Sequence, residues 1–297
     1  MKSDTYQQVA DAIIAALDAG VVPWRKPWNA PVGGALRNAI TGRPYSGINT
    51  MILGMAMMAR DYTDPRFLTF KQARAAGGSV RRGEHGTHIV FWRFIKGEAD
   101  ANGKARTIPM LRTFTVFNVT QVDGIAFPTV DTPATTWDAI AEAERVTSDY
   151  IAREGITFRQ QESDRAYYVP ARDTLVMPAR EQFRTAEGYY STLIHECGHS
   201  TGHTSRLGRF TGEAAIAKFG SADYGREELV AEFTSAFVSG AIGIACDAES
   251  AQNAAYIAGW RKAITADPRA VVVAAGKASH AADRILGVTA GEEAGEE

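Results

Sequence analysis

The amino-acid sequence predicts an α+β fold divided into two domains. The chain has 297 residues, which is long enough for two hydrophobic cores of ordinary size. Its halves carry opposite charge: residues 1–130 hold 16 Lys and Arg against 9 Asp and Glu, a formal net charge of +7, and the rest holds 16 against 25, a net charge of −9. We expect a basic α+β domain at 1–127, a linker at 128–136, a mainly helical domain at 137–290 and a disordered acidic tail at 291–297.

The basic half is predicted to contain both helices and strands. Apolar residues at helical spacing predict an opening helix that begins after Ser3 or Asp4 and ends at Gly20, and further helices are expected over 48–60 and 69–76. Prolines and tryptophans at 22–28 predict a loop after the first helix. Two β-rich runs, 89–92 and 114–117, are separated by a polar turn at 99–105, and this pattern predicts paired antiparallel strands.

The acidic half is predicted to be mainly helical with a small antiparallel sheet. A long helix is expected over 137–153, followed by a strand that begins at Thr157. The runs 167–169 and 174–177 flank a turn that starts with Pro170, which is typical of a β-hairpin. Helical patterns then cover about 185–201, 227–240, 250–265 and 270–286.

The composition indicates a cytoplasmic protein. Cys197 and Cys246 are the only cysteines, too few for a disulfide framework, so both are expected to be reduced. Acidic residues interrupt the first 20 positions, which excludes a signal peptide. No stretch has the roughly 18 uncharged apolar residues that a membrane-spanning helix needs, so no membrane contact is expected.

An HExxH motif, His195-Glu196-Cys197-Gly198-His199, carries the chemistry of the acidic half. Histidines four residues apart lie on one face of a helix, where both imidazoles can reach one ion, typically zinc. Glu196 is turned about 100° around the helix axis, so it can accept a proton from a nearby water without ligating the metal. The motif therefore predicts a zincin-like zinc metallopeptidase domain of the gluzincin type, with Glu196 as the general base. A helix with two surface histidines and a solvated glutamate is the alternative.

A catalytic zinc site needs a third protein ligand. In one class of zinc peptidase the motif continues as His-x-x-Gly-x-x-His, and the last histidine is the third ligand. Starting from His199, this sequence has Gly202 but carries Ser205 at the ligand position, so that pattern fails. The acidic run at 227–233 supplies a glutamate on a following helix: Glu228 is expected to bind the metal while Glu232, one turn on, accepts a hydrogen bond from a ligand histidine. Glu227 is the alternative ligand, and a helix N-terminus stabilised by acidic residues would need no metal. The ligand set His195, His199 and Glu228 suits Zn²⁺, and Mn²⁺ or Co²⁺ would also fit.

Two further residues are candidates for a supporting role beside the metal. His203 and Tyr224 can help a ligand or donate to a transition state, and the alternative for each is an ordinary polar position near a helix end. The glycine-rich stretch 205–225, which follows His203 and contains Tyr224, is expected to fold over the site as a lid.

The basic half has the residue types that bind single-stranded nucleic acid, in which aromatic rings stack on bases and cations follow phosphates. Two tryptophans alternate with two cations within five residues of the loop at 22–28, although a buried tryptophan pair that fixes the opening helix is the alternative. No phosphate-binding GxxxxGK[ST] loop is present, which argues against an NTPase. The expected DNA-binding residues are Trp24, Arg25, Lys26, Trp28, Lys71, Arg74, Arg81, Arg82 and Arg93.

The order of these motifs resembles the ArdC antirestriction family of conjugative plasmids. The resemblance rests on the runs at 23–28, 47–50, 70–73, 77–83, 195–202 and 227–233, and covers nearly the whole chain. It implies a protein that binds single-stranded DNA with little sequence preference and protects an incoming plasmid from restriction, with a restriction-system protein as a candidate peptide substrate. Cys197-Gly198 departs from the bulkier residues expected inside the motif, and glycine costs about 1 kcal/mol in a helix interior.

Two other functions stay open. The chain can be a DNA-binding protein whose metal is structural. It can also be a replication or primase accessory that shares the DNA-binding module, although no acidic cluster of a polymerase kind supports this.

Overall fold

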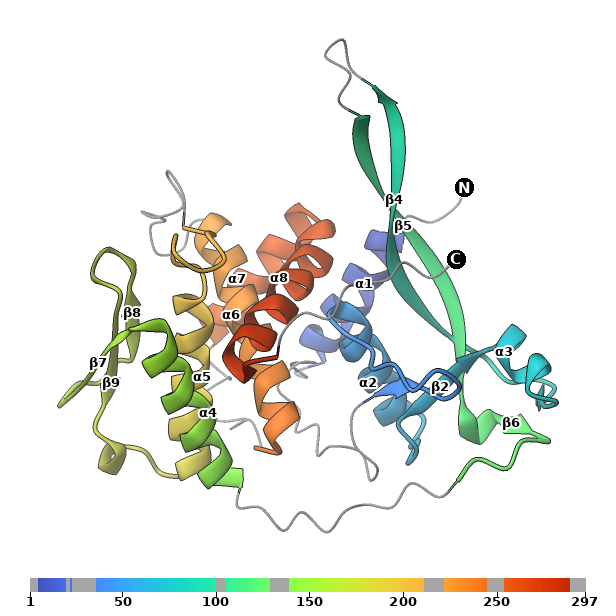
Figure 1. Cartoon of the computed structure of the whole chain (residues 1–297), viewed down its shortest axis with the longest axis horizontal. Coiled ribbons are helices and arrows are strands. Elements are labelled where there is room, and N and C mark those ends of the chain that lie inside the picture. Colours follow the sequence, from blue (N-terminus) through green and yellow to red (C-terminus); the bar gives the residue numbers. More distant parts are fainter. Residues whose placement is uncertain are drawn as a thin grey trace.

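The computed structural model describes residues 5–19, 22, 36–99, 105–128, 139–210, 222–244 and 254–288. Of residues 92–99 and 105–111 it describes the backbone alone. Strands gather at the two ends of the molecule and helices lie between them (Figure 1). This arrangement confirms the predicted α+β class.

The basic half is built on a four-stranded sheet with the order β1-β2-β5-β4. Helix α2 packs against it, and α3 begins with a capping box in which Thr69 accepts from the backbone N–H of Gln72. A short pair, β3 and β6, follows α3. The elements are α1 (Thr5–Asp18), β1 (Arg37–Asn38), α2 (Ile48–Ala59), β2 (Arg66–Thr69), α3 (Phe70–Ala75), β3 (Ser79–Val80), β4 (Thr87–Ala99), β5 (Ala105–Asn118), a 3₁₀ turn (Val119–Gln121) and β6 (Val122–Asp123).

Strands β4 and β5 form a hairpin much longer than the sequence pattern predicts. They pair in antiparallel register from Thr87 opposite Val116 to Ala99 opposite Ala105, with an irregularity after Lys96. The hairpin projects beyond the rest of the sheet as a two-stranded arm (Figure 1). The expected pairing is confirmed, but both strands continue through polar residues and Pro109, where the β pattern in the sequence fades.

The acidic half contains five helices and one small sheet among its described residues. Strand β9 lies in the middle of this sheet, antiparallel to β8 as predicted and parallel to β7. The elements are α4 (Ala139–Glu154), β7 (Thr157–Gln161), β8 (Tyr167–Val169), a 3₁₀ turn (Pro170–Arg172), β9 (Thr174–Pro178), a 3₁₀ turn (Arg180–Gln182), α5 (Ala186–Ser200), α6 (Ala222–Ile242), α7 (Ala254–Ala266) and α8 (Arg269–Leu286).

One hydrophobic core joins the two halves of the chain. Ile13 of α1 and Met51 of α2 belong to the same buried cluster as Phe233 of α6, Trp260 of α7 and Val271 of α8. The start of α2 comes close to the backbone of α8, with Gly47 at a φ of 57° that favours glycine. The basic half therefore adds two helices to the core of the acidic half, in addition to its own clusters under the sheet.

Several sequence predictions fall outside the described residues. They are the loop at 23–28, most of the linker at 128–136, Cys246 and the acidic tail at 291–297. No described helix has the length and apolar character that crossing a bilayer requires.

Candidate metal centre

Helix α5 presents the HExxH motif from the centre of the acidic half. Its first turn is capped by Thr185, whose hydroxyl accepts from the backbone N–H of Gly188 at 3.0 Å. The apolar face of the helix, including Leu193 and Ile194, is buried against α4 and the small sheet. The opposite side brings His195 and His199 together, with ring centroids 4.8 Å apart.

Gly198 allows α5 and α6 to pack closely beside the motif. A methyl group at this position would stand 3.2 Å from the Cα of Ala231, 3.3 Å from its carbonyl oxygen and 3.3 Å from the Cβ of Thr234. These contacts are tighter than ordinary packing, and two of them are to backbone that cannot rotate away. The glycine that looks unfavourable in an isolated helix is therefore explained by the neighbouring helix, which carries the third candidate ligand.

His195, His199 and Glu228 offer ligand atoms that all lie within 4.8 Å of one another. The Nε2 atoms of the two histidines stand 3.6 Å and 3.5 Å from the carboxylate oxygens of Glu228. Ligands bound at about 2.0–2.1 Å in a tetrahedral site stand roughly 3.3–3.4 Å apart. The nitrogen and oxygen donors, their spacing and their burial fit a divalent metal such as zinc.

Each histidine also meets a second carboxylate on its other ring nitrogen. Glu232 lies 3.3 Å from Nδ1 of His195, and Glu227 lies 3.4 Å from Nδ1 of His199. A proton held on each Nδ1 leaves each Nε2 free to bind a metal. Glu227, the alternative ligand in the sequence, thus lies beside Nδ1 of His199 and not in the group formed by His195, His199 and Glu228.

Arg209 holds Glu227 in position. Its guanidinium donates to both carboxylate oxygens of Glu227, at 3.0 Å and 2.6 Å, and its side chain is 6% exposed. The same group donates to the carbonyl of Gly198 and the hydroxyl of Thr201, at 2.9 Å and 2.7 Å, so it also satisfies the end of α5. Sequence reasoning assigned neither contact, because Arg209 lies in a loop whose path the local pattern does not predict.

Burial and the close pairing of histidines with carboxylates shift the pKa values of the site residues. Burial raises the pKa of Glu196, outweighing the attraction of the two histidines. Burial alone would lower the pKa of His195, but hydrogen bonds to Glu228 and Glu232 raise it to about 9. For Glu228, the positive charge of His199 outweighs burial and holds the pKa well below its usual range. A metal would replace the histidine protons as the partner of these carboxylates.

A second arginine ties the end of α5 to the small sheet. Arg206 donates to the carbonyl of Ser200 at 2.7 Å and to a carboxylate oxygen of Asp173 at 3.0 Å, and its side chain is 1% exposed. Asp173 also accepts a hydrogen bond from Tyr168 at 2.6 Å. This brace fixes β8 beside the motif, where the backbone of Tyr168 hydrogen-bonds the Glu196 carboxylate.

The remaining candidates of the acidic half, His203 and Tyr224, are not part of the group of three ligand residues. The His203 ring contacts the hydroxyl of Ser205 at 2.7 Å within its own turn. Tyr224 is half-buried in the first turn of α6, one turn before Glu228. The predicted lid at 205–225 is wrong at its end, since 222–225 already belong to α6, and 211–221 lie outside the described residues.

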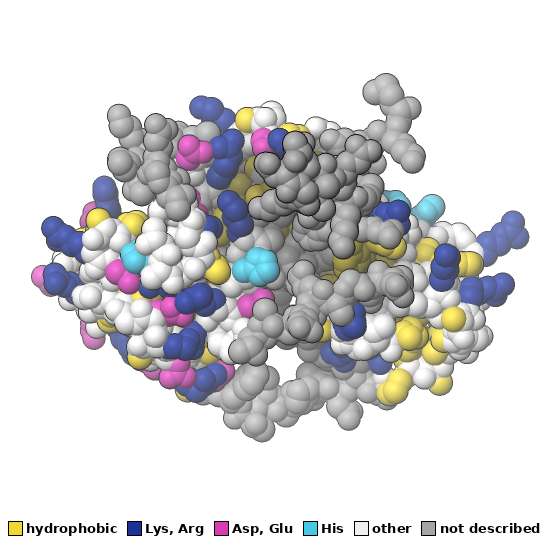
Figure 2. All heavy atoms as spheres, turned by 45° about the horizontal axis from the view of Figure 1, so that its top comes forward, with side chains coloured by type: hydrophobic (Ala, Val, Ile, Leu, Met, Phe, Trp, Pro, Cys, Tyr) yellow, Lys and Arg dark blue, Asp and Glu magenta, His cyan; other side chains and the backbone are white. Residues whose placement is uncertain are grey.

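The described candidates of the basic half are exposed but scattered. Lys71 and Arg74 project from α3, and Arg82 lies in the turn after β3. Arg81 is paired with Glu84 at 2.8 Å and with Asp123 at 3.5 Å, so its charge is largely matched. On the face drawn in Figure 2, described acidic side chains lie on the side of the acidic half, while Lys and Arg predominate on the other side. The tryptophan loop at 23–28 and the side chain of Arg93 lie outside the part of the chain that the structure describes.

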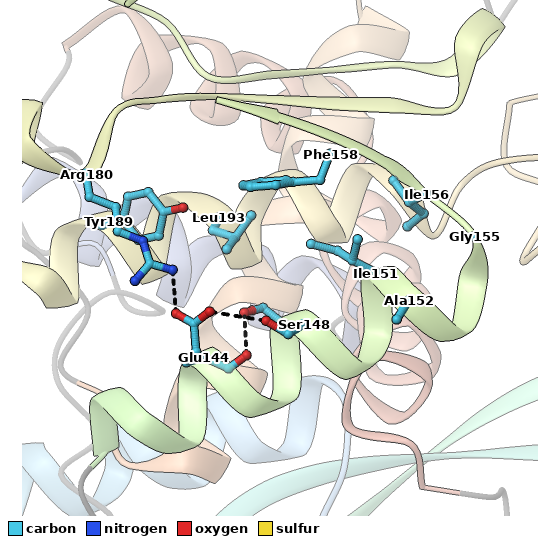
Figure 3. Close-up of a pocket in the computed structure, with 11 residues that line it drawn as sticks. Glu144, Ser148, Ile151, Ala152, Gly155, Ile156, Phe158, Arg180, Tyr189 and Leu193 are labelled. Atoms are coloured by element: carbon cyan, nitrogen blue, oxygen red, sulfur yellow. Dashed lines mark hydrogen bonds and ion pairs between the residues drawn. The ribbon is translucent and has the colours of Figure 1, made fainter. Parts of the chain in front are cut away.

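A separate cavity of about 400 Å³ lies on the other side of α5, between α4 and β7. Figure 3 shows its apolar wall, with Ile151, Ile156 and Phe158, and its polar end, where Glu144 pairs with Arg180. It lacks the HExxH histidines and is distinct from the metal centre.

Comparisons with known proteins agree with both halves. Residues 3–117 match the N-terminal domain of anti-restriction factor ArdC, and residues 144–277 match a zincin-like metallopeptidase domain. Two Escherichia coli proteins named DNA primase TraC are 39% and 36% identical over 96% of this chain, but the chain spans only 27% and 20% of their length. An uncharacterised Sinorhizobium fredii protein, y4eC, is 35% identical over 95% of this chain and 91% of its own length.

Solved structures of the antirestriction ArdC protein from plasmid R388 have the same overall fold. The metal-free structure aligns with a TM-score of 0.75 and 35% identity, covering 95% of this chain and 97% of the other. The Mn(II)-bound structure aligns with a TM-score of 0.75 and 34% identity over 96% and 98%. With a zincin-like half, an ArdC-type N-terminal half and 35% identity over 97% of the solved ArdC chain, this chain belongs to the ArdC family.

Proposed function

We propose that this chain is an antirestriction protein that binds single-stranded DNA through its basic half and hydrolyses peptide bonds at a zinc centre in its acidic half. The observation that carries the proposal is the convergence of two histidine nitrogens and the Glu228 carboxylate next to a buried Glu196. A structural metal site has no need of a buried carboxylate beside its ligands, whereas hydrolysis needs one.

The reaction would use the chain's residues as follows. His195, His199 and Glu228 would hold a divalent metal, which when bound supplies a Lewis acid that activates water and polarises a peptide carbonyl. Glu196 removes a proton from the attacking water and delivers it to the leaving amine as the C–N bond breaks. Burial raises the pKa of Glu196, which strengthens this carboxylate as a proton acceptor.

The small sheet offers a place for a peptide substrate. Among the described strands β8 pairs only with β9, so no described strand occupies its other edge, where we infer that an extended chain can pair. Backbone hydrogen bonds to an open edge bind peptides with little dependence on their sequence. A segment laid along β8 would pass Glu196, because the Tyr168 backbone already touches that carboxylate. We infer that a protein of the restriction system is the substrate.

Transfer of a plasmid into restricting cells tests the antirestriction proposal. Transfer is measured into a restricting and a matched non-restricting recipient, from donors with and without the chain. The chain should raise transfer into the restricting recipient alone, by limiting cleavage of the incoming DNA. An equal effect on both recipients, or none, would overturn the antirestriction role.

The TraC relatives favour a second candidate, a part in plasmid DNA priming. The chain matches 27% of the length of one such primase, so the shared region is one module of a larger protein. A primer-synthesis assay on single-stranded template, with the chain added to a primase and alone, separates the candidates. Stimulated priming without any effect on restriction would favour the accessory role.

A further inference from the structure

An exposed aromatic pair lies on the β4–β5 hairpin. Phe91 and Phe114 are each 42% exposed, and their rings meet edge to face with centroids 5.5 Å apart. The register places Phe91 opposite Arg112 and Phe114 opposite the buried Ile89, so all four side chains share one face of the ribbon. The core under the sheet ends at Ile89, and the two phenylalanines continue its face into solvent.

The position of the pair leaves it accessible. Strand β2 pairs with β5 only from Asn118 to Val116, and beyond that point β4 and β5 have no other strand beside them in the described part of the chain. Figure 1 shows the hairpin extending away from the helices as an arm. Large apolar rings at such a place cost solubility without adding to the core, so they indicate a binding surface.

The charge of the hairpin indicates which class of molecule this surface would bind. Strands β4 and β5 together contain four cations and one carboxylate, Glu98. Arg112 is exposed beside Phe91, and no ion pair joins it to a carboxylate in the regions that the structure describes. The other three cations are Arg93, Lys96 and Arg106. Exposed rings interspersed with cations complement a polyanion that also presents flat apolar faces.

We propose that Phe91 and Phe114 form a stacking platform for the bases of single-stranded nucleic acid, with Arg112 contacting the phosphate backbone. This inference rests on the proposed DNA binding of the basic half and gives it a site. Unpaired bases expose the faces that such rings stack on, whereas bases in a duplex already stack on one another. A second copy of the chain fits less well, because two basic ribbons side by side would repel.

Binding of a fluorescent oligothymidylate to the full chain tests the platform. Phe91→Ala and Phe114→Ala should each weaken binding at least about fivefold, the loss expected for one stacked base, and the double variant should weaken it further. Phe91→Tyr, which keeps a ring, should retain most of the affinity. Phe158→Ala is the matched control, since Phe158 is 37% exposed in the other half and should be without effect.

The salt dependence separates stacking from phosphate contact. The phenylalanine variants should lower affinity without changing the slope of log affinity against log salt, whereas Arg112→Gln should make the slope shallower by about 0.7. All variants are checked by thermal unfolding and by sedimentation. Binding to duplex DNA should be affected much less than binding to the oligothymidylate.

Each contrary result has its own meaning. If the wild type does not bind the oligothymidylate, the DNA-binding part of the proposed function fails. If the wild type binds and the folded double variant binds equally well, the platform is wrong and DNA binds elsewhere. An equal loss on duplex and single strands, or a change of oligomeric state in the double variant, would also overturn the platform.

Discussion

Replacing Gly198 by alanine tests whether close packing of α5 on α6 builds the metal centre. In an isolated helix this change would stabilise by about 1 kcal/mol, because alanine is the better helix former. Here the new methyl group meets Ala231 at 3.2 Å and Thr234 at 3.3 Å. Overpacking of this kind costs about 1–3 kcal/mol, so the net change in the free energy of unfolding is a loss of roughly 0–2 kcal/mol.

Gly259→Ala is the matched control for that change. Gly259 lies inside α7, and a methyl group there would meet nothing within 4 Å. This variant should gain up to about 1 kcal/mol, so the two substitutions should differ by about 1–3 kcal/mol in urea unfolding. The metal affinity should fall about tenfold or more in Gly198→Ala alone, since α6 must move outward with Glu228.

The reasoning would be refuted if Gly198→Ala stabilised the protein as much as Gly259→Ala and bound metal like the wild type. In that case the spacing of the two helices would be adaptable, and the glycine would have no part in placing the third ligand.

Three further predictions concern the surroundings of the site. Glu227→Gln should weaken metal binding about 10- to 100-fold, which is the usual effect of losing a carboxylate behind a ligand histidine. The control Glu187→Gln, on the exposed first turn of α5, should leave metal binding unchanged. Chelator competition measures the metal affinity of both variants, and equal affinities would reject a supporting role for Glu227. Burial alone would raise the pKa of Asp173, but its hydrogen bonds to Arg206 outweigh burial and hold this pKa below the ordinary value of 3.8. The pairing of Asp173 with Arg206 therefore stabilises the fold above pH 3.8, and this stabilisation is lost as the pH falls through the lower pKa of the folded state. Asp173→Asn should flatten the fall in unfolding free energy over that acidic range, and an unchanged profile would contradict the brace. Burial also raises the pKa of the Cys197 thiol, so in a Cys246→Ser background a thiol reagent should react only after unfolding, and rapid reaction of the native protein would be inconsistent with this packing.

Local sequence patterns predicted the elements that depend on local forces. The helix with the HExxH motif begins at a Thr185 cap, and the β8–β9 hairpin turns at Pro170. The acidic helix after the motif was also predicted, although it begins at Ala222, before the predicted start at 227. The i to i+4 spacing predicted that Glu228 and Glu232 share a helix face, and in the structure Glu228 lies near Nε2 of His195 and Glu232 near its Nδ1. Their roles at a metal stay predictions. Each of these features depends on residues that are close together in the sequence, so a local pattern can predict it.

Features that depend on distant segments were not predictable from such patterns. The role of Gly198 is set by Ala231 on another helix, and the role of Glu227 is set by Arg209 beyond the end of α5. The packing of α1 into the core of the acidic half follows from long-range complementarity that no local pattern records. The hairpin was predicted too short, because the outer parts of its strands include Lys96, Gly97, Glu98 and Pro109, which break the apolar alternation by which a strand is recognised.

The most direct test of the account is protection of an incoming plasmid by Glu196→Gln, beside the wild type and Glu187→Gln. Metal content and oligothymidylate affinity are measured on all three purified proteins. The account predicts that Glu196→Gln keeps its metal and its DNA binding but loses protection, because the ligands are intact and only the proton acceptor is gone. Full protection by a Glu196→Gln protein would contradict it, and would leave the metal centre with a structural role.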